Sequence, residues 1–250
     1  MSERKKTVII FGGSGNIGLE IVKNLDINKY NIYVVDRISE KDWFKNDVDC
    51  QGYYQADIND TNTLKNILEN ISDDSFEISA VVNVSYPRSN AYGLPFEDVS
   101  LEIFNENVNL HLGGYYNVMR LFIKFFLKQG HGNIINFSSI LGFNTPKFDH
   151  YPNTSIVSPI EYTAAKSAII SISKYLVKYH KNKNIRINCI SPGGIFNNHD
   201  NIFADRYRND TLNKGLLDSK DIVGTVNFLL SDDSEFINGQ NLVVDDGWSL

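Results

Sequence analysis

The sequence contains little cysteine, little proline and no long apolar run. Its two cysteines, Cys50 and Cys189, lie far apart in apolar stretches, which argues against a disulfide framework or a metal cluster and is typical of buried structural thiols. The six prolines form no proline-rich linker. No segment reaches the roughly 18 apolar residues of a membrane span, and "TVIIF" is too short for a signal-peptide core. We expect a cytoplasmic protein of one domain, residues 1–250, with no membrane association and no metal.

The chain also lacks an excess of positive charge. Its 24 Lys and Arg stand against 30 Asp and Glu, which gives a formal net charge of -6. Surfaces that bind nucleic acids or anionic membranes need concentrated Lys and Arg, and the "RKK" run at 4–6 is too short to provide this. The composition therefore argues against both partners, and its 42% hydrophobic content is that of an ordinary globular protein.

Short apolar runs alternate with helical patterns along the whole chain. Runs rich in β-branched residues and separated by helices are typical of buried parallel strands with right-handed crossovers. We predict an α/β fold, a Rossmann-type doubly wound, seven-stranded parallel sheet with helices on both faces, in a single domain. The expected strands are 7–11, 31–36, 50–57, 78–84, 132–139, 184–191 and 240–246, and the expected helices include 16–27, 60–72, 100–129, 160–182 and 219–231.

A glycine-rich segment, "GGSGNIG" (12–18), follows the first expected strand and leads into a helix. Glycines allow a tight turn and a close approach to a pyrophosphate, and a helix N-terminus offers free N–H groups to it. A purely structural turn is the alternative. The residues that we expect around the cofactor at this turn are Gly12, Ser14, Gly15, Asn16, Ile17 and Gly18.

The next expected strands end in polar residues that would face the same cleft. A carboxylate at Asp36 can bind the ribose diol of NAD(H) and would repel the 2′-phosphate of NADP(H). Arg37 could instead bind that phosphate, so NAD(H) is favoured and NADP(H) is possible. Asp57, followed by Ile58, could bind the adenine amino group or cap a helix. Asn83 could line the cleft or tie its strand to a neighbour.

Tyr162 and Lys166 lie four positions apart in "SPIEYTAAKSAIISISKYL" (158–176). Residues at i and i+4 share one face of a helix, so both side chains would point into the same space. This spacing alone fits a surface pair as well as a catalytic pair.

The ordered set of motifs resembles the short-chain dehydrogenase/reductase family, in its branch of single-domain enzymes of this length. The set includes "GGSGNIG", "INFSSILG", "YTAAK", "ISPGGIF" and "INGQNLVVDDG" and runs almost from end to end. The resemblance implies that Tyr162 is the general acid/base and that Lys166 lowers its pKa and holds the nicotinamide ribose. It implies that Ser139, with Ser138 as the alternative, orients the reacting carbonyl or alcohol. It also implies an asparagine on the long helix, Asn109 or alternatively Asn107.

The same resemblance assigns "ISPGGIF" to the cofactor, through Pro192, Gly193, Ile195 and Asn197. The sequence departs from the family pattern at several positions. Asn16 replaces a glycine of the turn, and Asn197 replaces a threonine. Tyr86 stands where a glycine is usual. Ser139 and Tyr162 are 23 positions apart, more than usual, but Tyr151 has Ser155 where the lysine would be needed.

The extra residues, 143–159, form an insertion that we expect to border the substrate cleft. Arg88 could bind a phosphate or carboxylate, and Tyr86 could stack on a sugar ring. The substrate candidates are Ser139, Tyr86, Arg88 and Tyr151.

Several segments, among them "NVSYPRSNAYG" and "NLHLGGYY", resemble a narrower group of bacterial dehydrogenases associated with nonulosonic-acid, flagellin or surface-glycan biosynthesis. That resemblance implies hydride transfer to or from a sugar derivative. The alternatives are a 3-oxoacyl thioester reductase and a non-catalytic protein that senses NAD(P). The apolar content of the long helices, by the same resemblance, implies a homo-oligomer, a tetramer rather than a dimer, to which the C-terminal "DDGWSL" could contribute.

Overall fold

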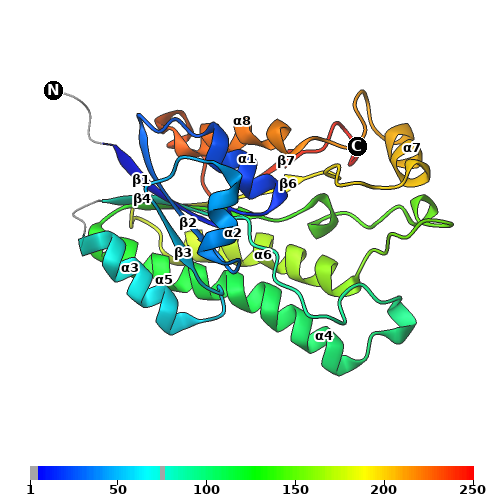
Figure 1. Cartoon of the computed structure of the whole chain (residues 1–250), viewed down its shortest axis with the longest axis horizontal. Coiled ribbons are helices and arrows are strands. Elements are labelled where there is room, and N and C mark those ends of the chain that lie inside the picture. The colour runs from blue at the N-terminus through cyan, green and yellow to red at the C-terminus, as the bar shows by residue number, and fades with distance from the viewer. Residues whose placement is uncertain (1–4, 74–76) are drawn as a thin grey trace.

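The computed structural model describes residues 5–73 and 77–250. Within them, seven parallel strands form one sheet in the order β3-β2-β1-β4-β5-β6-β7, with helices on both of its faces (Figure 1). The predicted fold is confirmed. The strands are β1 (Lys6–Phe11), β2 (Tyr30–Asp36), β3 (Gly52–Gln55), β4 (Ile78–Asn83), β5 (Gly132–Phe137), β6 (Ile185–Pro192) and β7 (Asn241–Val244).

The strands carry apolar side chains on both faces because each face is covered. In β1, Ile9 and Phe11 enter one hydrophobic core and Val8 and Ile10 enter the other. The first core lies under α3 (Thr61–Asp73), α5 (Gly114–Gln129) and α6 (Ile160–Tyr179), and the second under α1 (Asn16–Asn24) and α8 (Val223–Leu230). Near-continuous apolar strands are what a doubly covered parallel sheet requires.

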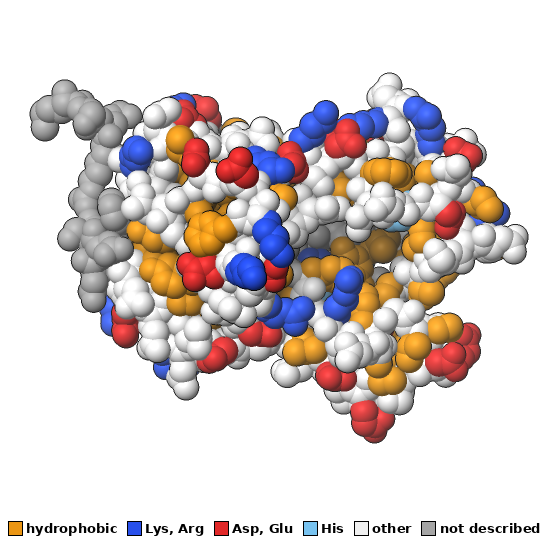
Figure 2. Space-filling model, viewed as in Figure 1, with side chains coloured by type: hydrophobic (Ala, Val, Ile, Leu, Met, Phe, Trp, Pro, Cys, Tyr) orange, Lys and Arg blue, Asp and Glu red, His pale blue; other side chains and the backbone are white. Residues whose placement is uncertain are grey.

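β1 and β4 are neighbours in the sheet, and the strand order reverses between them. From β1 the chain continues to β2 and β3 on one side of this pair, and from β4 it continues to β5, β6 and β7 on the other. Ligands of open α/β sheets bind at such a point, beyond the carboxyl ends of the strands. At this end Figure 2 shows a hollow in the surface with hydrophobic side chains inside it and Lys and Arg side chains on its margin.

Two helices were not predicted. The four-residue α2 (Glu40–Trp43) begins where the Ser39 hydroxyl accepts a hydrogen bond from the Asp42 N–H (3.2 Å), and Trp43 is buried and stacks on Tyr53 at 5.3 Å. α7 (Asn201–Asn209) begins where the Asp200 carboxylate accepts from the Phe203 N–H (2.8 Å). Both caps are local signals of a helix start. Neither helix is long enough to show the repeated spacing of apolar residues that predicts a helix.

The helix predicted at 100–129 is divided. α4 (Leu101–Val108) continues into a single π-helical turn (Asn109–Gly113) before α5 begins. A π-turn rotates the side chains within it relative to a regular helix and is frequent at functional sites. The remaining predicted helix, 219–231, is a 3₁₀ turn (Ser219–Ile222) followed by α8.

No helix in the described parts of the chain has the length and apolarity to cross a bilayer. Across 5–73 and 77–250, no group of His, Cys, Asp and Glu side chains is arranged to hold a metal ion. Both cysteines are free thiols; Cys189 is buried as expected, whereas Cys50 is only half-buried.

Candidate active site

The glycine-rich turn brings the backbone of β1, α1 and the β4 end together. Gly12 has φ +80°, and a Cβ there would lie 2.7 Å from the Ser85 backbone. A Cβ on Gly18 would lie 2.1 Å from the Gly12 carbonyl oxygen. α1 begins after Gly15, which provides no side-chain cap. No side chain caps the first-turn N–H groups of α1, so they are available to a phosphate.

The carboxylate of Asp36 lies at the end of β2, beside this turn. It accepts hydrogen bonds from the Ser14 N–H (3.0 Å) and the Arg37 N–H (2.6 Å). The Arg37 guanidinium lies 4.0 Å from the Asp57 carboxylate; the Arg37 side chain is exposed and that of Asp57 is half-buried. Asp57 accepts from Asn59, while Asp60 caps α3, so the helix-cap interpretation of Asp57 was wrong.

These groups line a cavity of about 420 Å³, which we call the nucleotide end of the cleft. Of the predicted cofactor residues, it contains Gly12, Ser14, Gly15, Asp36, Arg37, Asp57 and Ile58.

Tyr162 and Lys166 share one face of α6, and the end of β5 supplies Ser139 beside them. The Ser139 side chain hydrogen-bonds to Tyr162. The Lys166 ammonium nitrogen donates to the Phe137 carbonyl (2.8 Å) and lies 5.5 Å from the centre of the Tyr162 ring. Ser138 instead donates to the Lys166 carbonyl (2.8 Å) and so ties α6 to β5. Of the two serines, Ser139 is therefore the one that contacts Tyr162.

Burial dominates the electrostatics of this centre. It raises the pKa of Tyr162, as does the neighbouring Tyr86, while the hydrogen bond with Ser139 opposes the rise. Burial also lowers the pKa of Lys166 to about 7. The family resemblance predicts that Lys166 lowers the pKa of Tyr162, but burial of the tyrosine raises it. A phenolate here needs further positive charge, such as an oxidised nicotinamide would bring.

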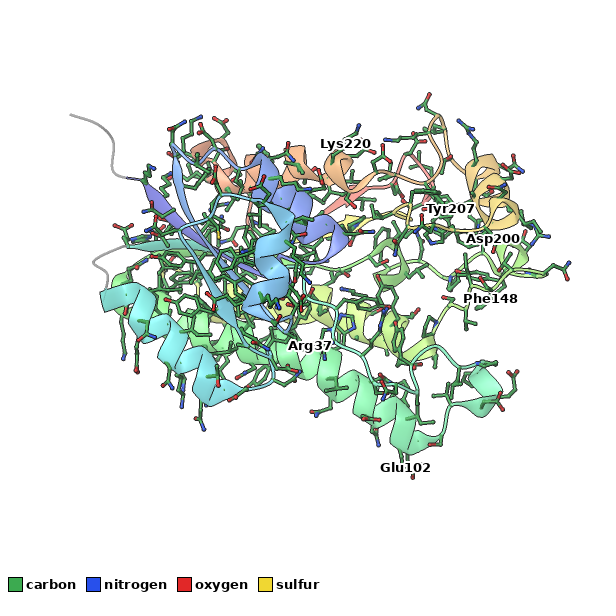
Figure 3. All side chains as sticks on the ribbon, in the orientation of Figure 1. Arg37, Glu102, Phe148, Asp200, Tyr207 and Lys220 are labelled. Carbon is green, nitrogen blue, oxygen red and sulfur yellow. The ribbon has the colours of Figure 1, made fainter. Side chains whose placement is uncertain are left out.

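The centre opens into a second cavity of about 390 Å³, the substrate end of the cleft. Aromatic side chains from three segments meet there. Trp248 stacks on Tyr207 of α7 at 5.9 Å, and Tyr151 contacts Phe203 at 5.6 Å. Figure 3 shows Tyr207, Asp200 and Phe148 toward one end of the molecule, apart from Arg37. The predicted residues in this cavity are Asn16, Ile17, Tyr86, Ser139, Tyr151, Tyr162, Lys166, Pro192, Gly193, Ile195 and Asn197.

The insertion at 143–159 is held against α7. Its His150 is buried, and the Nε2 atom lies 2.5 Å from the Asp210 carboxylate. Arg206 donates to the carbonyls of His150 (3.2 Å) and Pro152 (2.5 Å). Two residues of the insertion, His150 and Tyr151, line the substrate-end cavity.

Comparison with known proteins agrees with this geometry. A family profile described as enoyl-(acyl carrier protein) reductase matches residues 13–249. The chain is 38% identical to a post-translational flagellin modification protein A of Campylobacter coli, over 98% of both chains. A short-chain dehydrogenase of Leptospira borgpetersenii with bound NAD+ is 32% identical and superposes with a TM-score of 0.86, over 99% of this chain and 94% of the other. The chain belongs to the short-chain dehydrogenase/reductase family.

As a short-chain dehydrogenase/reductase, the protein is an NAD(P)-dependent oxidoreductase. The nucleotide end fits such a cofactor on its own features, because it has an uncapped helix N-terminus, glycines that admit no Cβ, and the Asp36 carboxylate at the end of β2. A 3-oxoacyl-[acyl-carrier-protein] reductase of Chlamydia trachomatis is also similar, at 29% identity over 97% of this chain and 96% of that one.

Neither of the two asparagines predicted for the site, Asn109 or Asn107, lines the cleft. Asn109 is exposed on the π-turn and lines neither cavity, and Asn107 is buried, where its side chain accepts from the Ser89 N–H (2.9 Å). The residue of this turn that faces Tyr162 is His111, at 6.0 Å between ring centres. The π-turn sets which side chain points inward, and a count along a regular helix misses it.

Three other predicted positions differ from expectation. Asn83 is fully buried beneath the cleft, where its carbonyl accepts from the Tyr115 hydroxyl (3.0 Å). Gly18 lines neither cavity and acts through the close packing of the turn. Arg88 lies at the nucleotide end, 5.1 Å from the Tyr86 ring centre, rather than among the substrate residues.

Sequence reasoning missed most of the aromatic side of the substrate end. Trp248 belongs to "DDGWSL", which we expected at an oligomer interface, yet it is 3% exposed within the subunit. His150 and Tyr151 belong to the insertion, so the insertion was a usable signal for them. The missed residues that line this cavity include His150, His199, Phe203, Tyr207 and Trp248.

Proposed function

We propose that this dehydrogenase transfers hydride between NAD(H) and a hydroxyl or ketone of a sugar derivative used in surface-glycan biosynthesis. The observation that carries the reaction is the half-buried Tyr162, which contacts Ser139 and lies beside Lys166 in the substrate end of the cleft. The flagellin-modification relative supports the glycan assignment.

In this proposal Tyr162 moves the proton of the reacting hydroxyl. A bound nicotinamide supplies the hydride acceptor or donor. The Ser139 hydroxyl orients the substrate oxygen against Tyr162, and Lys166 binds the cofactor ribose from below. Because burial disfavours charge on both Tyr162 and Lys166, the phenolate forms only in the loaded site, which couples proton transfer to cofactor binding.

NAD(H) is the proposed cofactor. Two backbone N–H groups fix the Asp36 carboxylate at the end of β2, and a carboxylate that binds the ribose there would repel a 2′-phosphate. Arg37 lies beside Asp57, which balances its charge.

The first experiment compares NADH and NADPH binding by fluorescence titration. We expect NADH to bind more tightly, and we expect Asp36→Ala to weaken NADH while strengthening NADPH. Arg37→Ala is the matched control and should leave NADH affinity within about threefold, because an exposed pair contributes little. NADPH preference in the wild type would overturn the assignment.

The second experiment offers the loaded enzyme a panel of amino-sugar and nucleotide-sugar derivatives beside 3-oxoacyl thioesters. Turnover of a sugar that disappears in Tyr162→Phe supports the proposal. Turnover of thioesters alone would support the reductase alternative, which the Chlamydia relative favours. Tight NADH binding without turnover of any candidate would favour a sensing protein.

We also propose a homo-oligomer, with a tetramer as the expected state. Large apolar or aromatic side chains are exposed on α5 and α6, which suits them for contact with another copy; they are Tyr116, Leu127, Tyr175 and Tyr179. A sedimentation mass near one 28.4 kDa chain would contradict this. Residence in the cytoplasm stays a prediction.

A further inference from the structure

His150 is a buried imidazole in the wall of the substrate end, and the roles above leave it unused. It belongs to the insertion, is 4% exposed and lines the substrate-end cavity. The rings of Phe203, Tyr207 and Trp248 surround it, with centres at 6.1, 5.8 and 6.3 Å. Small-molecule sites are typically aromatic walls with a few placed polar atoms, so the polar atoms of this wall decide which ligand it accepts.

The pairing of His150 with Asp210 determines which ring nitrogen is free for a ligand. Burial alone would raise the pKa of Asp210, but hydrogen bonds from His150 and Lys147 outweigh it and lower that pKa, so the carboxylate is ionised. Nε2 of His150 lies 2.5 Å from this carboxylate. Because an ionised carboxylate only accepts hydrogen bonds, Nε2 carries the proton.

The other nitrogen of the ring, Nδ1, has no hydrogen-bond partner within the described residues. Lys147 lies 3.3 Å from the Asp210 carboxylate and Arg206 donates to the His150 carbonyl at 3.2 Å. A further positive charge on the imidazole would be repelled by both side chains. Nδ1 therefore carries a lone pair, and it is the acceptor that His150 offers in the cavity.

Tyr207 offers the complementary group beside it. The Tyr207 hydroxyl accepts from the Gly194 N–H (2.6 Å), and its own proton has no acceptor among residues 5–73 and 77–250. A phenol can donate one hydrogen bond in addition to those that it accepts. Tyr207 is 4% exposed, stacks on Trp248 and lines the same cavity. The wall thus holds one free acceptor and one free donor on adjacent rings.

We propose that His150 and Tyr207 are specificity-determining residues that bind one hydroxyl of the substrate. This hydroxyl donates to Nδ1 of His150 and accepts from the Tyr207 hydroxyl. A hydroxyl can do both at a single oxygen atom. A carboxylate or phosphate only accepts, so the lone pair of Nδ1 would repel it, and an ammonium group only donates and would leave the Tyr207 proton unpaired.

The recognised hydroxyl is a second one, distinct from the reacting group. Ser139 and Tyr162 place the reacting oxygen, and both residues line the same cavity. The inference rests on the proposed function and adds to it that the sugar derivative carries a free hydroxyl away from the reacting carbon. A substrate without that hydroxyl would leave a buried donor and a buried acceptor unpaired, so it should bind more weakly.

The kinetic test combines two variants with the monodeoxy analogues of the panel sugar that the enzyme turns over. In the wild type, one analogue should have a KM about tenfold above that of the parent sugar, with kcat kept. In His150→Phe, which keeps an aromatic ring, and in Tyr207→Phe, the KM values of parent and analogue should be within about twofold. Such a cycle isolates the interaction, because a packing change affects parent and analogue equally.

Phe148→Leu is the matched control for the kinetic test. Phe148 is an aromatic residue of the same insertion, but it is 67% exposed and lines neither cavity. The tenfold difference should persist in this variant. If the difference persists in His150→Phe and Tyr207→Phe as well, or if no analogue is penalised in the wild type, the inference is wrong.

A second readout needs no turnover. In protein labelled with ¹⁵N-histidine and saturated with NADH, the Nδ1 resonance of His150 reports whether that atom accepts a hydrogen bond. The probes are methyl glucoside, methyl galactoside and N-acetylglucosamine, and the control is tetrahydropyran, which has the same ring without hydroxyls. We expect at least one sugar to shift the resonance saturably and tetrahydropyran to leave it unchanged.

Two results of this titration would contradict the hydroxyl assignment. They are an equal shift with tetrahydropyran and the absence of a shift with every sugar. The titration also separates this inference from the function on which it rests. If the sugars shift the Nδ1 resonance but no panel compound is turned over, the proposed function fails and the hydroxyl-binding inference stands.

Discussion

The nucleotide end of the cleft is formed mainly by backbone atoms, and the substrate end is formed mainly by side chains. The nucleotide end consists mainly of backbone, because Gly12 and Gly18 allow the turn and the N–H groups of Ser14 and Arg37 hold the Asp36 carboxylate. The substrate end consists of side chains, with aromatic rings from the insertion, α7 and the C-terminal segment packed together. Backbone sites tolerate few substitutions, whereas a side-chain site is altered by changing its residues.

The catalytic centre at the junction gives the largest expected effect. Tyr162→Phe removes the proton-carrying oxygen and should reduce kcat about 10³-fold while NADH affinity is kept. Steady-state rates and fluorescence titration measure the two quantities. Tyr151→Phe is the matched control at the substrate end, and a loss of kcat in it with activity kept in Tyr162→Phe would mean that the two tyrosines had been assigned the wrong way round.

At the nucleotide end, Gly18→Ala should be severe because its Cβ would meet the Gly12 carbonyl oxygen at 2.1 Å. We expect NADH affinity to fall at least about tenfold and stability to fall by about 1–3 kcal/mol. Gly224→Ala is the control, since a Cβ there meets nothing within 4 Å in α8, and helix propensity should stabilise that variant by up to about 1 kcal/mol. Denaturant unfolding compares the two, and equal effects would contradict the crowding argument.

Because the pKa of Lys166 is lowered in the folded protein, the free energy of unfolding should depend on pH. Its pKa is about 7 in the folded protein and 10.5 in its ordinary state, so between these values the unfolded chain binds a proton that the native state lacks. The free energy of unfolding should therefore rise with pH from 7 to 10, relative to Lys166→Met, by up to about 1.4 kcal/mol per pH unit. Urea unfolding at pH 7 and 9.5 measures the difference. Parallel slopes would show that Lys166 stays charged when folded.

The smallest expected effect lies at the substrate end. Arg206→Ala removes the hydrogen bonds to the carbonyls of His150 and Pro152, so the insertion should loosen and KM should rise about three- to tenfold with kcat kept. Arg208→Ala, on the same helix, serves as the control. A fall in kcat without a change in KM would place the insertion in the chemical step instead.

The same contrast explains what the sequence could predict. The strands, the glycine-rich turn and Asp36 follow from local rules, because periodicity and turn chemistry act over a few residues. Ser139, Tyr162 and Lys166 could be proposed because the order of the motifs fixes them, and the structure brings the three together.

The remaining residues depend on three-dimensional packing. The π-turn moves Asn109 outward and His111 inward, and no residue count along the helix reveals such a turn. Trp248 reaches the cleft only because the last residues of the chain fold back onto Tyr207. Arg88 follows β4 as expected, but its loop turns toward the nucleotide end.

The two tryptophans differ in their surroundings. Trp43 is buried in the hydrophobic core, where it stacks on Tyr53 of β3, while Trp248 lines the substrate end. In the Trp43→Phe variant, the tryptophan fluorescence would therefore come from the substrate end alone. Quenching or a wavelength shift of the Trp248 fluorescence would then report ligand binding in real time. This measurement needs no added dye and no knowledge of the substrate's chemical identity.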